Sequence, residues 1–366
     1  MNNLLESLFA RCEAAGASDI HLSPGEAPRM RLRGELEPLD DYRVFDSVAV
    51  DSIAMELGLT TLPLGCPDGT ERIRYTLSKE GSVDGAVSSP SGARYRFNVF
   101  REMNRHAVAL RRIDMTLLDF HRLGLPRRIE DFCRESEGLV IVSGPTGSGK
   151  STTLAAAVDR INRTRHGHIV TIEDPVEFIH PSYKCLVRQR QVGRDTVSFN
   201  AALVESLRQD PDVILVGEMR DVDTMRTALR AAETGHLVFS TLHAGDAVGA
   251  VERMVSVFPA EEQSSVRQQL ALVLRGVVAQ HLLATADGAG RVPAVELMVN
   301  TPAVANLIAS GRSQQLYSLI ETGGRFGMCT LDESLATLVR QGRIAEHAAV
   351  RLSKNPEILM RRIGNA

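Results

Sequence analysis

The spacing of apolar and polar residues changes along the chain, and these changes divide the chain into parts. Residues 4–9 place leucine and phenylalanine at helical spacing, and residues 29–39 alternate apolar and charged side chains around a glycine, as a β-hairpin does. Strict alternation over residues 94–100 predicts a strand with one buried face, and residues 107–113 are its expected partner strand. We therefore expect a small α+β domain over residues 1–113.

The pattern is weaker in the second half of this expected domain. Residues 60–68 and 88–92 are rich in turn-forming residues and predict loops, and residues 73–77 suggest a strand. Residues 114–126 show neither helical spacing nor strand alternation, and they form the candidate linker to the next part of the chain.

Strand-like and helix-like patterns alternate from residue 127 to residue 285, which favours a mainly parallel sheet covered by helices. Short apolar runs predict strands at residues 139–142, 169–172, 213–216 and 237–241. Helical spacing at residues 199–207 and 224–233 predicts helices between them. The fold class that follows is α/β.

The last part, residues 286–366, is expected to be a helical region. An apolar stripe over residues 266–277 predicts a long helix that leads into it. Further helices are expected over residues 301–311 and 332–342, with Asp332 as the N-cap of the second.

Composition narrows the choice of protein class. The chain has 366 residues, 43% hydrophobic and 24% charged, which is ordinary globular material for two or three domains. The net charge of −3 gives no global argument for binding nucleic acid, so we expect no direct nucleic-acid partner. No stretch has the features of a signal peptide or the eighteen or so apolar residues of a membrane span, so a cytoplasmic protein without an integral membrane segment is expected. The five cysteines are scattered and indicate neither a disulfide framework nor a zinc site.

The strongest chemical signal is the sequence GPTGSGKSTT, which begins one residue after the strand predicted at residues 139–142. The spacing G-x-x-x-x-G-K-S is that of a Walker A P-loop, in which glycines let backbone N–H groups wrap a triphosphate. Lys150 then reaches the β- and γ-phosphates of ATP, and the Ser151 hydroxyl coordinates Mg²⁺. The expected nucleotide-binding residues are Gly144, Pro145, Thr146, Gly147, Ser148, Gly149, Lys150, Ser151 and Thr152.

Three further segments place polar residues directly after apolar runs, where ligands of open α/β sheets bind. TIEDPVEF, residues 171–178, brings carboxylates that could hold Mg²⁺ or deprotonate a water; a solvated acidic turn is the alternative, and the P-loop favours the first interpretation. DPDVILVGEMRD delivers Glu218 at the position of a Walker B acid. GHLVFSTLH ends in Thr241 and His243, which could sense a γ-phosphate or could be core residues.

The blocks GPTGSGKSTT, TIEDPVEF, DPDVILVGEMRD and TGHLVFSTLH resemble, in this order, the Walker A, Asp box, Walker B and His box of the secretion ATPase superfamily. Within it the chain is most similar to the PilT family of type IV pilus retraction ATPases, because ASDIHL, RYRFNVF and TGGRFGMCTLDESL resemble that family's other landmarks. The resemblance implies an N-terminal PAS-like domain, a RecA-like core and a homohexameric ring with ATP between neighbouring subunits. It also implies a place at the inner-membrane base of the pilus, beside the pilus platform protein.

The resemblance also implies roles for acidic and histidine residues. Glu177 corresponds to the general base, and Glu218 to a second acid that acts at or near Mg²⁺. His236 and His243 belong to the His box.

Hydrolysis needs positive charge on the γ-phosphate beyond that of Lys150. In this family the charge comes from arginines of the N-terminal domain, and Arg96 and Arg111 fall in the matching strands. Close competitors are Arg94, Arg101 and Arg112.

Two departures from the family pattern concern the output of the motor and the first domain. Ala305 stands where an arginine is expected, and residues 59–92 look longer than usual. The lack of a four-cysteine zinc insertion and of a longer N-terminal region favours retraction over extension or type II secretion. The alternatives are an accessory retraction ATPase, a type IV secretion or DNA-uptake ATPase, and a non-catalytic nucleotide-binding scaffold. Intact Lys150, Glu177 and Glu218 argue against the scaffold.

Overall fold

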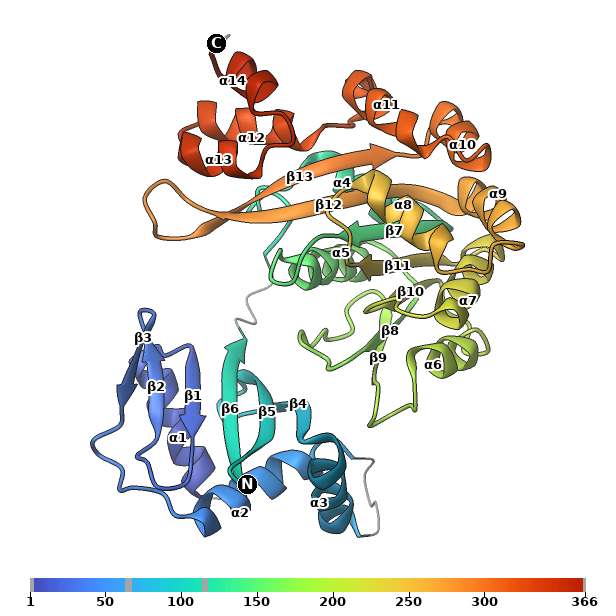
Figure 1. Cartoon of the computed structure of the whole chain (residues 1–366). Helices are drawn as coiled ribbons and strands as arrows, with labels where there is room; N and C mark the ends of the chain where they lie inside the picture. The colour runs from blue at the N-terminus through green and yellow to red at the C-terminus, as the bar shows by residue number, and fades with distance from the viewer. Residues whose placement is uncertain (1–2, 63–67, 114–117, 365–366) are drawn as a thin grey trace. The chain divides into compact units, whose positions relative to one another are not determined.

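The computed structural model describes residues 3–62, 68–113 and 118–364, which form two compact units (Figure 1). The first unit comprises residues 1–116, 173–179 and 190–198, and the second comprises residues 117–172, 180–189 and 199–366. The start of the candidate linker, residues 114–117, lies outside the described residues.

A six-stranded antiparallel sheet forms the frame of the first unit. Its strands, in the order β3-β2-β1-β6-β5-β4, are β1 (Asp19–Leu22), β2 (Arg29–Leu32), β3 (Glu35–Pro38), β4 (Ser82–Ser88), β5 (Arg94–Glu102) and β6 (Arg105–Ile113). The helices are α1 (Asn3–Ala15), α2 (Ser47–Leu59) and α3 (Gly69–Glu80), and all three contribute to one core with the sheet. Tyr95, Phe97 and Val99 of β5 are buried in that core, which confirms the predicted alternation.

The strand predicted near residues 73–77 is wrong, because these residues belong to helix α3. Ile73 and Leu77 are both buried, whereas Tyr75 between them is 64% exposed. Residues four apart share one face in a helix and in a strand alike, so only the middle residue distinguishes the two. The loop predicted at residues 60–68 lies partly outside the described residues.

A seven-stranded sheet forms the frame of the second unit, in the order β13-β12-β7-β11-β10-β8-β9 (Figure 1). Its first five strands in sequence are β7 (Gly138–Ser143), β8 (His168–Glu173), β9 (Leu186–Gln191), β10 (Val213–Val216) and β11 (Leu237–Leu242). The accompanying helices are α4 (Arg127–Asp131), α5 (Lys150–Thr164), α6 (Phe199–Ser206), α7 (Val222–Glu233), α8 (Ala247–Ser256) and α9 (Gln263–Val273), with the 3₁₀ turn η1 (Phe132–Arg134). The four predicted strands are confirmed, and they run parallel, so their carboxyl ends meet at one edge.

The helix predicted over residues 266–277 ends four residues early, because the chain turns into strand β12 (Leu274–Ala284). β12 lies beside β7 and pairs with β13 (Arg291–Val299), so the sheet continues into the part of the chain predicted to be helical. The sequence predicted a longer helix because Leu274, the first residue of β12, continues the helical spacing of the apolar residues in α9. Gly276 permits the close packing of β12, since a Cβ there would lie 2.2 Å from the Phe132 ring.

Short helices follow the sheet. They are α10 (Pro302–Ala309), α11 (Leu316–Thr322), α12 (Leu331–Arg340), α13 (Glu346–Leu352) and α14 (Pro356–Gly364), with the 3₁₀ turns η2 (Ser313–Gln315) and η3 (Gly324–Phe326). The N-cap of α12 is Thr330, not Asp332 as predicted: the Thr330 side chain accepts the Glu333 N–H. Asp332 is instead buried and accepts hydrogen bonds from the Ser353 hydroxyl and the Lys354 N–H.

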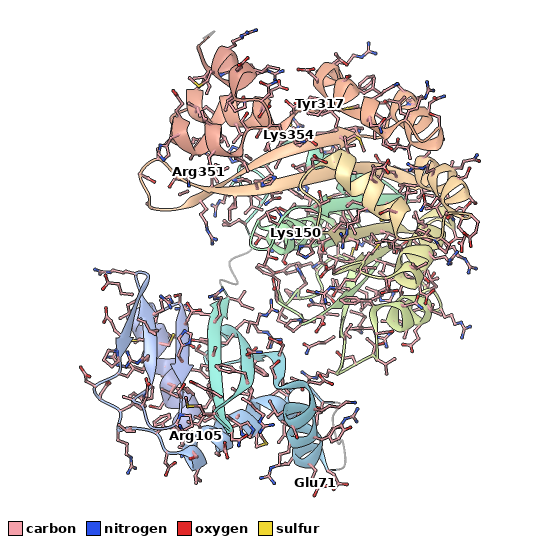
Figure 2. The ribbon with its side chains drawn as sticks, viewed as in Figure 1. Glu71, Arg105, Lys150, Tyr317, Arg351 and Lys354 are labelled. Atoms are coloured by element: carbon pink, nitrogen blue, oxygen red, sulfur yellow. The ribbon has the colours of Figure 1, made fainter. Side chains whose placement is uncertain are left out.

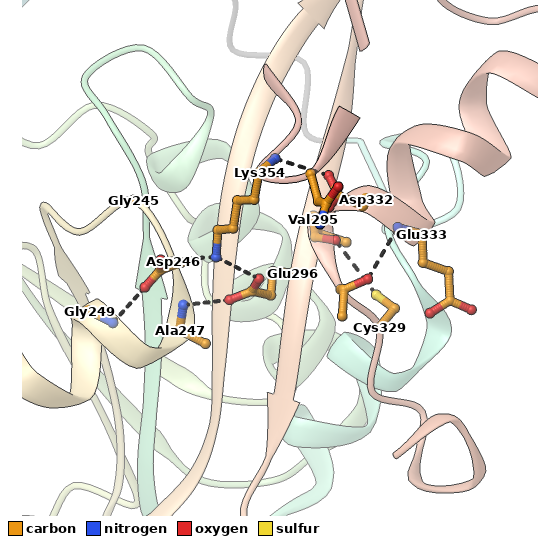
Figure 3. Close-up of polar contacts among 12 residues, drawn as sticks. Gly245, Asp246, Ala247, Gly249, Val295, Glu296, Cys329, Asp332, Glu333 and Lys354 are labelled. Carbon is orange, nitrogen blue, oxygen red and sulfur yellow. Dashed lines mark hydrogen bonds and ion pairs between the residues drawn. The ribbon is translucent and has the colours of Figure 1, made fainter. Parts of the chain in front are cut away.

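Lys354, in the turn between α13 and α14, joins these last helices to the sheet (Figure 3). Its ammonium lies 2.9 Å from an Asp246 carboxylate oxygen and 3.1 Å from one of Glu296. Asp246 caps α8, and the other oxygen of Glu296 accepts the Ala247 N–H. The C-terminal helices are thus bound to the loop that follows β11. Among the described residues no helix is both long and apolar enough to cross a membrane.

Candidate functional site

The loop between β7 and α5 has the geometry of a phosphate cradle. Gly144, Gly147 and Gly149 have φ angles of 147°, 78° and 89°, which favour glycine. No side chain caps α5, so its first N–H groups and the positive end of its dipole are available to an anion. The hydroxyl of Ser148 is buried without a hydrogen-bond partner among the described residues. These free donors fit the phosphates of a nucleotide.

Lys150, the first residue of α5, folds back over this loop (Figure 2). Its ammonium donates hydrogen bonds of 2.9 Å to the carbonyl oxygens of Gly144 and Pro145. Burial lowers the pKa of Lys150 below its ordinary value, and the charge of Glu218 opposes this effect. Lys150 therefore lies within electrostatic reach of Glu218, and its bonds to the carbonyls can be exchanged for bonds to phosphate oxygens.

A pocket of about 350 Å³ opens beside the loop. Residues 145–148, the end of β12 and residues of α13 line it. Among the latter is Arg351, which is labelled in Figure 2. The pocket mixes apolar side chains with two histidines, His281 and His347. Its volume is at the lower end of the range of about 300–1,000 Å³ that is common for small-molecule sites.

Glu218 follows β10 by two residues and is held between two side chains. Arg220 lies 2.6 Å from one carboxylate oxygen, and His243 lies 3.3 Å from the other. The Glu218 side chain is 18% exposed, so it is partly buried but reachable. Ser151 is exposed in the first turn of α5, and Thr152 beside it is half-buried. A hydroxyl and a carboxylate are the hard oxygen ligands that Mg²⁺ binds together with substrate phosphates, so Ser151 and Glu218 fit this ion.

β11 lies beside β10, the strand that precedes Glu218. The Thr241 side chain is buried, and its hydroxyl donates to the Gly217 carbonyl at 2.6 Å, which ties β11 to the segment that carries Glu218. His236 lies before β11, at the opposite end of this strand from His243, and its ring donates to the Ala231 carbonyl at 3.0 Å. Of the two His-box histidines, the structure brings only His243 to the acid.

Glu177 belongs to the first unit, where it lies 3.7 Å from the Arg96 guanidinium. Arg94, one of the competing arginines, is buried and donates to the Val176 carbonyl at 3.2 Å. Arg101 lies near the turn between β5 and β6 and donates to Asn104. The expected base and one expected arginine are therefore neighbours in the first unit.

Arg111 stands opposite Arg96 in the register of β5 and β6, so both project from the same face of the sheet. The Arg111 guanidinium is 75% exposed, yet its Nε donates to Asp19 at 2.7 Å. Burial alone would raise the pKa of Asp19, but hydrogen bonds from Ser18 and Arg111 and the Arg111 charge lower it below its ordinary value. Asp19 thus remains ionised and fixes the direction of Arg111.

The structure adds two residues that the sequence analysis did not single out, Arg220 and Gln280. The Gln280 side chain on β12 is 3% exposed and contacts both the loop and α5. A single amide within the apolar run GVVAQHLL was the available signal, because a buried amide is usually hydrogen-bonded.

Comparison with known proteins agrees with this geometry. The family model described as type II/IV secretion system protein matches residues 1–324. The chain is 44% identical over 361 residues to the type IV pilus retraction ATPase PilT of Pseudomonas aeruginosa, which covers 96% of this chain and 99% of that protein. It is 37% identical to the type IV pilus ATPase PilU of the same organism, over 94% of this chain and 87% of PilU.

A solved structure of the pilus retraction motor PilT with bound ADP superimposes with a TM-score of 0.87 at 40% identity, covering 98% of this chain and 99% of that one. The family model and these relatives span nearly the whole chain. The chain therefore belongs to the type II/IV secretion ATPase family and, within it, to the PilT family.

Proposed function

We propose that the chain hydrolyses ATP to ADP and phosphate. The observation that carries this proposal is the uncapped N-terminus of α5 behind a glycine-rich loop, with the Lys150 ammonium folded onto that loop. The N–H groups of the loop and Lys150 bind the β- and γ-phosphates. The pocket beside the loop gives room for the nucleoside.

Each polar residue of the site has a proposed role. Ser151 and Glu218 would hold Mg²⁺, which spreads the charge of the β- and γ-phosphates when bound. A carboxylate oxygen of Glu177 takes the proton of the attacking water. His243 keeps the Glu218 carboxylate in place through its 3.3 Å contact.

Arg96 and Arg111 would supply the remaining positive charge to a neighbouring subunit's γ-phosphate. They lie in a different unit of the chain from the P-loop. A subunit that offers its P-loop to one neighbour and its arginines to another makes a head-to-tail contact, which closes into a ring. We propose a homohexamer of this kind, with a PAS-like first unit and a RecA-like second unit that carries the C-terminal helices.

The biological role we propose is the retraction of type IV pili. Its support is the likeness to proteins named pilus retraction ATPase and, in Neisseria gonorrhoeae, twitching motility protein, the latter 49% identical over 75% of this chain and 74% of that protein. The partner would be the platform protein at the cytoplasmic face of the inner membrane. An accessory retraction role is the second candidate, because the match to PilU also spans most of the chain and Ala305 on α10 replaces an expected arginine.

Steady-state phosphate release by the purified full chain, with ATP and Mg²⁺, tests the activity. We expect turnover by the wild type and none by Lys150→Ala, whose melting temperature should match the wild type because the Lys150 ammonium donates its hydrogen bonds to carbonyls of the loop and not to the core. Equal turnover by the two proteins would refute the P-loop assignment.

A further inference from the structure

We propose that Gln280 is a positioning residue of the P-loop, on which the affinity for the nucleotide depends. Its amide Nε2 donates to the Ser148 carbonyl at 2.7 Å, and its Oε1 accepts from the Thr153 hydroxyl at 2.8 Å. Ser148 lies in the loop, and Thr153 lies in the first turn of α5. One buried side chain from β12 therefore joins the loop to the first turn of α5.

The glycines of the loop make room for this contact. A Cβ at Gly149 would lie 2.8 Å from the Gln280 amide nitrogen, and a Cβ at Gly144 would lie 2.3 Å from the Gln280 carbonyl oxygen. Real Cβ atoms do not approach other atoms this closely, so a side chain at Gly144 would push the β12 backbone away from the loop, and a side chain at Gly149 would displace the Gln280 amide. The absence of a side chain at Gly144 and Gly149 thus allows Gln280 to pack against the loop, as well as allowing phosphates to approach it.

The contact fixes the direction of a phosphate donor. In a trans peptide the C=O and the following N–H point in opposite directions. Because Gln280 holds the Ser148 carbonyl, it also holds the Gly149 N–H pointing away from β12. A loop whose N–H groups are oriented before ATP arrives loses less entropy on binding.

The chemistry of the site calls for an amide. The Ser148 carbonyl needs a donor and the Thr153 hydroxyl needs an acceptor, and glutamine offers both without a charge. At this depth of burial a charge would be costly, and a side chain lacking one function would leave a polar group unsatisfied. Both hydrogen bonds of the Gln280 amide join groups of the chain itself.

The test compares ATP affinity among variants of the full chain, and it rests on the proposed ATP binding. Gln280→Met keeps the length of the side chain and removes both hydrogen bonds. Thr153→Val removes one bond from the other side, and Thr153→Ser keeps the hydroxyl as the conservative rescue. Val277→Ala is the control: it truncates a fully buried residue of the same strand without touching the loop.

We expect Gln280→Met to weaken ATP binding roughly tenfold, which corresponds to about 1.4 kcal/mol, because the Gly149 N–H is then no longer held in place before ATP binds. KM should rise by a similar factor with kcat little changed. Thr153→Val should show a smaller loss that Thr153→Ser restores, and the double variant should lose less than the product of the single effects. Val277→Ala should lower the melting temperature and leave the affinity unchanged.

The inference is overturned if the wild type binds ATP while Gln280→Met and Thr153→Val bind it equally well, whatever their melting temperatures. If Gln280→Met does not fold, the comparison of Thr153→Val with Thr153→Ser decides alone. A wild type that binds no ATP refutes the proposed function itself, which separates the two failures.

Discussion

Replacing Lys354 by methionine should destabilise the second unit by breaking the ion-pair network that joins the C-terminal helices to the loop after β11 (Figure 3). Glu296 is 1% exposed, so the substitution leaves a buried carboxylate without its cation. Removing one partner of a fully buried pair costs about 3–5 kcal/mol, and exposed pairs are worth about 0–1 kcal/mol. The Lys354 and Asp246 side chains are each 33% exposed, so we expect an intermediate loss of about 2–3 kcal/mol.

Urea unfolding followed by circular dichroism measures this loss. Lys184→Met is the matched control, because it makes the same substitution at an exposed position of the second unit and should change stability by no more than about 0.5 kcal/mol. The double variant Lys354→Met/Glu296→Gln should recover part of the loss, since it removes the unpaired charge while the amide oxygen can still accept the Ala247 N–H. Equal stability of Lys354→Met and the wild type, or no recovery in the double variant, would refute the reasoning.

The stabilisation that the Lys354, Asp246 and Glu296 network provides should depend on pH in a defined direction. Burial alone would raise the pKa of Asp246, but the Gly249 N–H and Lys354 lower it, so its contribution to stability is present at neutral pH and is lost as the pH falls through the folded-state pKa. Burial alone would lower the pKa of Lys354, but Glu296 and Asp246 raise it, so its contribution is lost only as the pH rises through that raised pKa. The stability difference between Lys354→Met and the wild type should therefore be flat from about pH 5 to about pH 9. A difference that halves between pH 6 and pH 8 would contradict this.

Three further predictions concern catalysis. Glu177→Gln and Glu218→Gln should each bind ATP yet hydrolyse it at least roughly a hundredfold more slowly in a phosphate-release assay, and near-normal turnover would remove the role assigned to that residue. Mixing Lys150→Ala subunits with Arg111→Ala or Arg96→Ala subunits should recover part of the turnover that each lacks alone, because some interfaces then join an intact P-loop to an intact arginine; no recovery would argue that the arginines do not act across subunits. Chelating Mg²⁺ should stop turnover without changing the melting temperature, and continued turnover would remove the magnesium roles of Ser151 and Glu218.

The P-loop and the parallel strands could be predicted because their signals are local. Four apolar residues before GPTGSGKSTT define a buried strand and the loop after it, whatever the rest of the chain does. The position of Glu218 after a buried strand could be predicted for the same reason, since it follows β10 by two residues. The contact of His243 with Glu218 arises only when β10 and β11 align side by side.

Features that depend on residues distant in the sequence could not be predicted from the spacing of apolar residues. Helix α3 was mistaken for a strand because Ile73 and Leu77 fit both periods, and the exposed Tyr75 carries no sequence signal. β12 continued the apolar stripe of α9, and only its place beside β7 makes it a strand. Gln280 acquires its role from that same pairing, which sets its amide against the loop.

The central claim is that ATP hydrolysis by this chain powers pilus retraction, and complementation of a strain that lacks the gene tests it most directly. The measurement is the retraction of single labelled pili in cells that carry the wild type or Glu218→Gln at equal protein level. We predict that the wild type restores retraction and that Glu218→Gln leaves long surface pili that do not retract, because the site binds ATP but turns it over slowly. Full retraction with Glu218→Gln, or the same pilus behaviour with and without the wild-type gene, would contradict the claim.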